Sequence, residues 1–249
     1  MLRKIIESFF HRVLIKNNFL PHSRYLSSKL LFAKSIRMKL YQKGDIISDN
    51  IAFLGYYEWE LSSIIKSISK NSAIMVDVGA NMGYFSLLFL ANSKNSILIA
   101  YEPSPNVFLL LKNNITINGF QNVALLNNYA VSNKSETLLF DNNNPNQSGW
   151  GHISVNFGIP VQAVSLDDEF YESNNVIDIL KIDVEGFEFN VLNGAYKLLS
   201  MHRIKNIFFE INNEMLHFQS TTKDEIFIYL KKNGYSYRYI NPELIHAFL

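Results

Sequence analysis

The sequence predicts an α/β fold built on a doubly wound, mostly parallel β-sheet, and three stretches carry that prediction. In the first, residues 74–90, the apolar run IMVDV is followed by a glycine-bearing loop and an apolar helical pattern. The second, 96–102, and the third, 177–183, are apolar runs that each end in an acidic residue. Short apolar runs of this kind are typical of parallel strands that are covered on both faces. Strands that alternate with helices in this way indicate an α/β architecture.

The loop after the first strand has the composition of a nucleotide-binding turn. Gly79 and Gly83 bracket it, and glycine permits both a sharp bend and the close approach of a ligand. Between them stand Ala80 and Asn81, so the middle glycine of the dinucleotide pattern G-x-G-x-x-G is missing. Asp77 precedes the loop, and its charge would repel a phosphate and attract a cation. The loop therefore favours S-adenosylmethionine, which is cationic and has no phosphate, over a nicotinamide dinucleotide.

Glu102 gives a second reason to expect a nucleoside ligand. It follows the next strand, 19 residues after Gly83. A carboxylate at this place in an α/β unit accepts hydrogen bonds from ribose hydroxyls.

Four motifs in order give the chain a family resemblance. They are DVGANMGYFSL at 77–87, AYEPSPNVFLLLKNNITING at 100–119, VSLDD at 164–168 and ILKIDVEGFEFNVLNGA at 179–195. Together they resemble the FkbM family of S-adenosylmethionine-dependent methyltransferases, over roughly residues 55–234. The resemblance implies a class I methyltransferase (Rossmann-like) fold with a seven-stranded sheet whose last strand is antiparallel. It also implies S-adenosylmethionine as methyl donor and, usually, O-methylation of a sugar or a natural product.

The resemblance also implies a set of donor-binding residues. Asp77 is expected at the amino group of the donor, Glu102 at its ribose and Ala130 near its adenine. The full set is Asp77, Gly79, Ala80, Asn81, Gly83, Tyr84, Phe85, Glu102, Pro103, Ala130 and Asp183.

Methylation of a hydroxyl requires that its proton be removed, so a general base is expected near the methyl group. Asp183 and Glu185 follow the strand that faces this position, and His152 and His217 are alternatives. Carboxylates such as these also suit Mg²⁺. Sequence spacing does not show that they converge, so no metal site is predicted.

Residues 133–165 interrupt the alternation of strands and helices. Segments 136–140 and 152–157 alternate like strands around an Asn-rich turn, which predicts an inserted β-ribbon above the carboxyl edge of the sheet. Loops at this edge usually carry specificity. The predicted substrate-binding residues are therefore Ser148, Trp150, His152 and, after the fifth strand, Glu210.

Several further elements are expected from local pattern. A helix is expected over 27–40, an extended segment over 46–54, one strand over 122–131 and one helix over 187–199. Asp167 and Asp168 are expected to cap the short helix that follows them, because Asp accepts hydrogen bonds from free helix N–H groups.

Charge divides the chain into a basic N-terminal extension, 1–45, and a methyltransferase domain, 46–249. Residues 1–43 hold ten Lys and Arg and one Glu, a net +9, which leaves −8 on the rest of a chain whose total is +1. The extension is expected to be helical, either as a cap on the domain or as a peripheral contact with an anionic membrane. No nucleic-acid motif accompanies the charge, so no nucleic-acid partner is expected.

Composition excludes several classes of function. The chain has no cysteine, which rules out disulfides, thiolate metal sites and cysteine nucleophiles. No apolar run approaches the ~20 residues that span a bilayer, and the start is not a convincing signal peptide. A cytoplasmic location is therefore expected, at most peripheral at the inner face of the membrane. Two alternatives to a methyltransferase stay open: a nicotinamide-dependent oxidoreductase, and a silent module that binds S-adenosylmethionine without chemistry.

Overall fold

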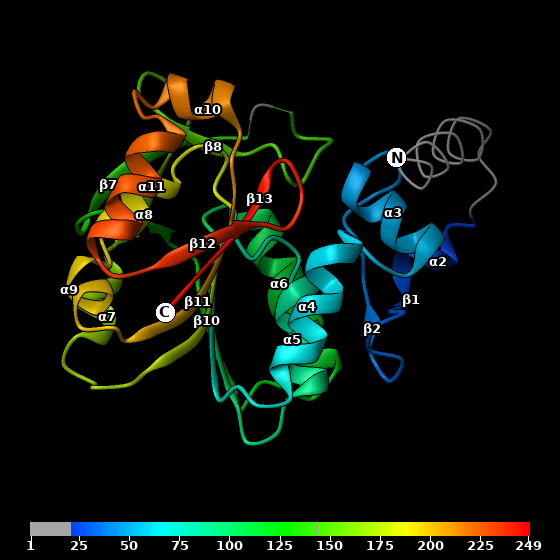
Figure 1. Cartoon of the computed structure of the whole chain (residues 1–249). Coiled ribbons are helices and arrows are strands. Elements are labelled where there is room, and N and C mark those ends of the chain that lie inside the picture. The colour runs from blue at the N-terminus through cyan, green and yellow to red at the C-terminus, as the bar shows by residue number, and fades with distance from the viewer. Residues whose placement is uncertain (1–20, 143) are drawn as a thin grey trace.

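The computed structural model describes residues 21–142 and 144–249. Its centre is a seven-stranded sheet in the order β12-β13-β11-β10-β3-β4-β5 (Figure 1). Strands β11, β10, β3, β4 and β5 are parallel, and β13 lies antiparallel between β11 and β12. The predicted class I methyltransferase sheet, with its antiparallel last strand, is thus confirmed. The strands are β3 (Ile74–Val78), β4 (Ile97–Tyr101), β5 (Ala124–Asn127), β10 (Ile177–Ile182), β11 (Ile204–Glu210), β12 (Ser236–Tyr239) and β13 (Leu244–Phe248).

Helices cover both faces of this sheet, as Figure 1 shows. Side chains alternate along each strand, so Met75 of β3 packs in one core cluster and Val76 in the other, and both are fully buried. Burial on both faces explains why the strands read as continuous apolar runs. The Met75 side is covered by α4 (Trp59–Ser69), α5 (Tyr84–Asn92) and α6 (Pro105–Ile117). The Val76 side is covered by α7 (Leu166–Phe170), α8 (Glu188–Asn193), α9 (Tyr196–Ser200) and α11 (Lys223–Lys232).

A four-stranded sheet stands at the carboxyl edge of the parallel strands. Its order is β6 (Ala130–Val131), β9 (Ile159–Val164), β7 (Glu136–Asp141) and β8 (His152–Ser154). β7 and β8 are antiparallel, as predicted for the inserted ribbon, but β9 and β6 extend the ribbon into a sheet. The single strand expected over 122–131 was wrong. It divides into β5 and β6, which belong to different sheets.

The helix expected over 27–40 was also wrong. After the short α2 (Ser23–Leu26), the chain forms the two-stranded sheet β1 (Ser28–Lys29) and β2 (Arg37–Met38). The side chains of Asn114, on α6, and Asn118, directly after it, each exchange two hydrogen bonds with the backbone of this segment, at Lys39 and Arg37 respectively. These partners lie far away in the sequence and satisfy backbone groups that a helix would have paired internally. The expected helical extension therefore fails over 27–45, and residues 1–20 lie outside the described part.

Residues 46–54, expected to be extended, form α3 (Ile46–Leu54) instead. Asp45 caps its first turn through the backbone N–H of Ser48, and Gly55 ends it in the left-handed conformation. Both are ordinary helix boundary signals. Ile51 and Ala52 of α3 join the core cluster that contains α5 and α6.

The helix expected over 187–199 is interrupted at Gly194, where a Cβ atom would lie 2.0 Å from the carbonyl oxygen of Ser132. The expected capping role of Asp167 and Asp168 is corrected as well. Ser165 caps α7, and Asp167 accepts hydrogen bonds from the backbone N–H groups of Lys197 and Leu198 at the start of α9. Finally, α10 (Asn213–Phe218) follows β11 at the carboxyl edge.

Candidate functional site

The carboxyl ends of β3, β4, β10 and β11 meet in a cleft of about 790 Å³, a volume that includes open solvent. The loop 79–83 forms one wall, and Asp183 to Glu185 form another. The remaining walls come from other elements, through Ile47 of α3, Tyr57 before α4 and Phe140 of β7. The complete lining is Ile47, Tyr57, Gly79, Ala80, Asn81, Met82, Tyr84, Phe85, Glu102, Pro103, Phe140, Ser148, Gly149, Gly151, Lys181, Asp183, Val184, Glu185 and Glu210.

The loop needs glycine at its first position and tolerates asparagine at its third. A Cβ atom on Gly79 would lie 1.8 Å from the carbonyl oxygen of Asp183, so the loop and the end of β10 can approach only without a side chain there. Asn81 has φ +51, in the left-handed region that asparagine adopts more readily than most residues. Asn81 thus takes the place of the missing glycine without losing the turn.

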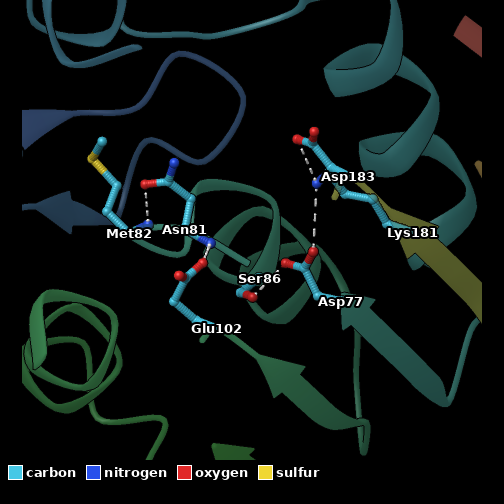
Figure 2. A network of polar contacts seen from close by, with 7 residues as sticks. All are labelled: Asp77, Asn81, Met82, Ser86, Glu102, Lys181 and Asp183. Atoms are coloured by element: carbon cyan, nitrogen blue, oxygen red, sulfur yellow. Dashed lines mark hydrogen bonds and ion pairs between the residues drawn. The ribbon is translucent and has the colours of Figure 1, made fainter. Parts of the chain in front are cut away.

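Glu102 ties this loop to β4. One carboxylate oxygen accepts a hydrogen bond from the backbone N–H of Asn81 at 2.9 Å (Figure 2). The other accepts one from the backbone N–H of Ser104 at 2.8 Å. Burial raises the pKa of Glu102 to about 7, and the two N–H groups act in the opposite direction. Each oxygen keeps a second lone pair, so the carboxylate can still accept a bond from a ligand hydroxyl.

Lys181 is the buried cation of the site, at 4% exposure. Its Nζ lies 3.1 Å from Asp183 Oδ2 and 3.7 Å from Asp77 Oδ1, as Figure 2 shows, and it stands over the ring of Phe85. Asp77 is fully buried, and its other oxygen accepts a hydrogen bond from the Ser86 hydroxyl at 2.6 Å. Burial lowers the pKa of Lys181, but the charges of its acidic neighbours outweigh it and raise the pKa overall. The ammonium therefore stays charged between the two carboxylates.

An apolar slot continues from the cleft between the two sheets. It shares Gly79, Pro103, Phe140, Gly151 and Val184 with the cleft. Its other lining residues are Val78, Tyr101, Tyr129, Ala130, Val131, His152, Ile153 and Phe187. A slot of this composition suits a flat, weakly polar ring system.

On its other side, the cleft joins an acidic cavity that contains about 1250 Å³, open solvent included. Asp183, Glu185 and Glu210 line both spaces. The other residues of the acidic cavity are Glu188, Ile211, Asn212, Asn213, Glu214, Pro242 and Glu243. Burial, followed by the charge of Asp183, raises the pKa of Glu185 to about 8 and that of Glu210 to about 7. The acids of this cavity thus destabilise one another's charges.

The backbone at the site is unusual at three non-glycine positions. Asn81, Glu185 and Glu58, which precedes α4, have φ between +41 and +51. Burial and the charges of Glu210 and Asp183 raise the pKa of Glu58 well above its ordinary range. Left-handed residues of this kind are often found at functional sites.

Comparison with known proteins identifies the family. The family model described as "Methyltransferase FkbM domain" matches residues 77–237, which include the loop, Glu102 and all of β10 and β11. The chain belongs to the FkbM methyltransferase family.

Two relatives show how far the likeness extends. The hexuronic acid methyltransferase AglP of Haloferax volcanii is 26% identical over 144 residues, which cover 57% of this chain and 58% of AglP. The crystal structure of an FkbM methyltransferase from Methylobacillus flagellatus KT matches with a TM-score of 0.52 at 17% identity, over 72% of this chain and 44% of that one. The chain thus spans about three fifths of the curated relative that it matches, and the solved structure shows the fold.

Most of the donor-binding residues expected from the FkbM resemblance lie together. Gly79, Ala80, Asn81, Tyr84, Phe85, Glu102, Pro103 and Asp183 line the cleft, and Ala130 lines the slot. Asp77 and Gly83 do not line the cleft. Asp77 lies beneath it against Lys181, so Asp183, 32% exposed, is the carboxylate that a ligand can reach. Gly83 begins α5 with φ +89 and packs against Leu111.

The other expected site residues are more scattered. Glu185 and Glu210 line both the cleft and the acidic cavity, and Ser148 lines the cleft with a buried hydroxyl that has no protein partner. His152 lines the slot, beside the ring of Phe218. Trp150 is 47% exposed and lines neither the cleft nor the slot. His217 is exposed on α10 and lines none of the three spaces.

Sequence reasoning missed Lys181, although a signal for it existed. It is the one charged residue inside an otherwise apolar stretch, 179–182, as Asp77 is inside 74–78. The two residues are register partners in the parallel pair β3 and β10. Ile47 was missed because no pattern places the N-terminal segment over the cleft. Asp45 holds it there, because its Oδ1 accepts a hydrogen bond from the backbone N–H of Ser148 at 2.7 Å.

Two searches of the described residues bear on other functions. Within 21–142 and 144–249, no group of three or more His, Cys, Asp or Glu side chains is arranged to hold a metal ion. Within the same ranges, no helix has the length and apolar character needed to cross a membrane.

Proposed function

We propose that this protein is an S-adenosylmethionine-dependent O-methyltransferase that acts on a hydroxyl group of a sugar. One observation carries the proposal. The glycine-walled cleft, with its accessible carboxylates, continues into an apolar slot at the carboxyl edge of an FkbM-family sheet. Ligands of doubly wound sheets bind at this edge.

The residues present fit the donor. The cleft offers Asp183 and Glu210 to the donor's positive charges, and Glu102 to its ribose hydroxyls. The slot, with Ala130 and Val131, offers a narrow apolar space to adenine. A phosphate-bearing dinucleotide would meet the same carboxylates as repulsive charges, which argues against the nicotinamide alternative. When bound, S-adenosylmethionine supplies an electrophilic methyl group.

Glu185 is our choice of general base. It lines both the cleft and the acidic cavity, so it stands between the donor and the space left for an acceptor. Its pKa of about 8 lies close to neutral pH. At such a pKa a fraction of the side chain is ionised and can accept the proton of the hydroxyl, and the carboxyl group then holds that proton effectively. Asp183 is already paired with Lys181, which favours a role in binding positive charge. The exposed His217 lines neither the cleft nor the acidic cavity, so it is not placed to act as the base.

The sugar acceptor rests on two supports. The name of AglP assigns a hexuronic acid to that relative. In this chain, the acidic cavity beside the cleft is lined by carboxylates and by the amides of Asn212 and Asn213, which suit a polyhydroxylated ligand.

Titration calorimetry with S-adenosylmethionine, S-adenosylhomocysteine and NAD tests the donor. We expect the first two to bind and NAD not to bind. Binding of NAD alone would overturn the proposal. Incubation with labelled S-adenosylmethionine and a panel of sugars tests the reaction. Donor binding without methyl transfer to any sugar would support the silent module instead.

We also propose that the basic N-terminal segment touches an anionic membrane surface. Its described basic residues, Arg24, Lys29, Lys34, Arg37, Lys39 and Lys43, are all exposed. Because Leu30, Ile36 and Met38 of the same segment are core residues, charge substitutions are a better test than deletion. The triple variant Lys34→Gln, Arg37→Gln, Lys39→Gln should bind anionic liposomes more weakly at low salt. Unchanged binding would contradict the membrane proposal.

A further inference from the structure

Glu188 lines the acidic cavity and carries a buried oxygen without a hydrogen-bond partner. Its side chain is 2% exposed, and Oε1 accepts a hydrogen bond from the backbone N–H of Gly186 at 3.1 Å. Its Oε2 is buried and has no hydrogen-bond partner in the protein. A buried polar atom without a partner costs free energy, so such an atom at a cavity wall is available to a ligand.

The charge around Glu188 is strongly one-sided. Asp183, Glu185, Glu210 and Glu243 line the same cavity. Among the described residues, Lys181 is the one basic side chain at ion-pair distance from any of them, and it is shared with Asp77. Burial raises the pKa of Glu188 to about 7, and the charge of Asp183 adds to that effect. Positive charge from a ligand would relieve this repulsion.

We infer that the acidic cavity binds a polyhydroxylated acceptor through a protonated amino group, as in a sugar with a free amine. This inference rests on the proposed function, since the cavity opens into the cleft at Asp183, Glu185 and Glu210. The ammonium donates to Glu188 and its neighbours, and the amides of Asn212 and Asn213 serve the hydroxyls. The described carboxylates are not arranged as a metal site, which favours an organic cation.

The same charges disfavour a sugar acid. A hexuronate would bring a carboxylate into a cavity whose own carboxylates already repel one another, and like charges in close contact are strongly unfavourable. An N-acetylated sugar would lose the ammonium but keep its hydroxyls. These three forms of one sugar therefore separate charge recognition from shape.

The test uses the full chain, saturated with S-adenosylhomocysteine. The probes are methyl glycosides of glucose, galactose and mannose, each as the free 2-amine, the N-acetyl derivative and the uronic acid. We expect the tightest free-amine probe to bind about tenfold more tightly than its N-acetyl form, as one charged hydrogen bond would provide, and the uronic acid to bind most weakly. Equal binding of the three forms, tighter binding of a uronic acid, or no binding of any amine would overturn the inference.

Variants assign the preference to this cavity. Glu188→Gln removes the charge with little change in shape, and Glu243→Gln removes an exposed charge of the same cavity without touching the core. We expect both to lower the preference for the amine severalfold, and the exposed Glu172→Gln, outside the cavity, to leave it unchanged. A preference that survives both cavity variants would contradict the inference.

Binding of S-adenosylhomocysteine is measured first in every sample. This measurement distinguishes a failure of the proposed function from a failure of the inference about the amine. Loss of that binding in the parent chain would count against the proposed function. Normal binding of it without a preference for the amine would overturn the present inference alone.

Discussion

The carboxylates at the carboxyl edge of the sheet form two groups that differ in what stabilises their charge. At the cleft, Asp183 and the underlying Asp77 flank Lys181, and Glu102 accepts two backbone hydrogen bonds. In the acidic cavity, Glu188 keeps an unpartnered oxygen, and Glu185 is destabilised by its acidic neighbours. Lys181 and backbone N–H groups partner the first group, although Asp77 Oδ1 accepts no hydrogen bond, whereas Glu188 Oε2 has neither a hydrogen bond nor a described basic side chain at ion-pair distance.

The difference indicates how one sheet edge can serve two ligands. The cleft carboxylates are held rigidly, which suits a donor that must be positioned closely for methyl transfer. The cavity carboxylates are crowded, which suits an acceptor whose charge they attract. If this contrast is right, variants in the two groups should have opposite effects on stability.

The largest effect is expected in the cleft, from Lys181→Met. The substitution leaves Asp77 buried without its cation, and the loss of one partner of a buried pair costs about 3–5 kcal/mol of unfolding free energy. Urea unfolding measures it. The control is Lys205→Met, because Lys205 is 57% exposed beside Asp178, and loss of such a surface pair costs about 1 kcal/mol or less.

The double variant Lys181→Met, Asp77→Asn should recover part of the lost stability, because it removes the uncompensated charge as well. If Lys181→Met costs no more than Lys205→Met, the cleft does not depend on its buried cation and the contrast fails.

A smaller effect of opposite sign is expected in the cavity, from Glu188→Gln. The pKa of Glu188 in the folded chain, about 7, lies above its ordinary value of 4.5, so the folded chain holds a proton that the unfolded chain has lost. The contribution of Glu188 to the free energy of unfolding is fully present below about pH 4.5 and is lost as pH rises through about 7. At about pH 8 the variant should therefore be more stable than the parent, by about 3 kcal/mol.

Unfolding curves of the parent and the Glu188→Gln variant, recorded between about pH 5 and pH 8, measure this effect. The other acidic residues named above at this cavity are Asp183, Glu185, Glu210, Glu214 and Glu243. The parent should lose stability as pH rises, and the variant should lose less. A variant that is less stable than the parent at pH 8 would show that Glu188 is structural rather than poised for a ligand.

The smallest effect concerns ligand affinity rather than folding. Glu102→Ala removes the acceptor expected at the ribose, and the loop loses its bond from Asn81. The affinity for S-adenosylhomocysteine should fall about tenfold, or about 1.4 kcal/mol, measured by calorimetry. Glu172→Gln, outside the site, is the matched control. Equal affinity in wild type and Glu102→Ala would overturn the ribose assignment.

Much of the fold could be predicted because its signals are local. The apolar strands 74–78, 97–101 and 177–182 and the glycine loop are readable within short windows. The cleft residues that belong to these strands and to the loop were found for the same reason. Asp45 and Gly55 were equally local signals for α3, yet the segment between them was taken as extended.

The errors lie where distant partners override local pattern. The apolar and basic residues of 27–40 suggested a helix, but the side chains of Asn114 and Asn118 bind the backbone there in an extended form. The uniform run 122–131 divides because β6 pairs with β9 in another sheet. No short window of the sequence contains both a segment and the distant partner that binds it.

The sequence by itself determined the central apolar strands, the family and the acids that follow those strands, because these depend on local periodicity and short motifs. Only the tertiary structure decided which acids are satisfied and which are exposed to a ligand. Asp77 reads as a ligand-binding residue in the sequence but lies buried against Lys181, and Glu188, which no motif assigned to a site, carries an unpartnered oxygen. Charge stabilisation depends on distances across the sheet, and these are set by packing.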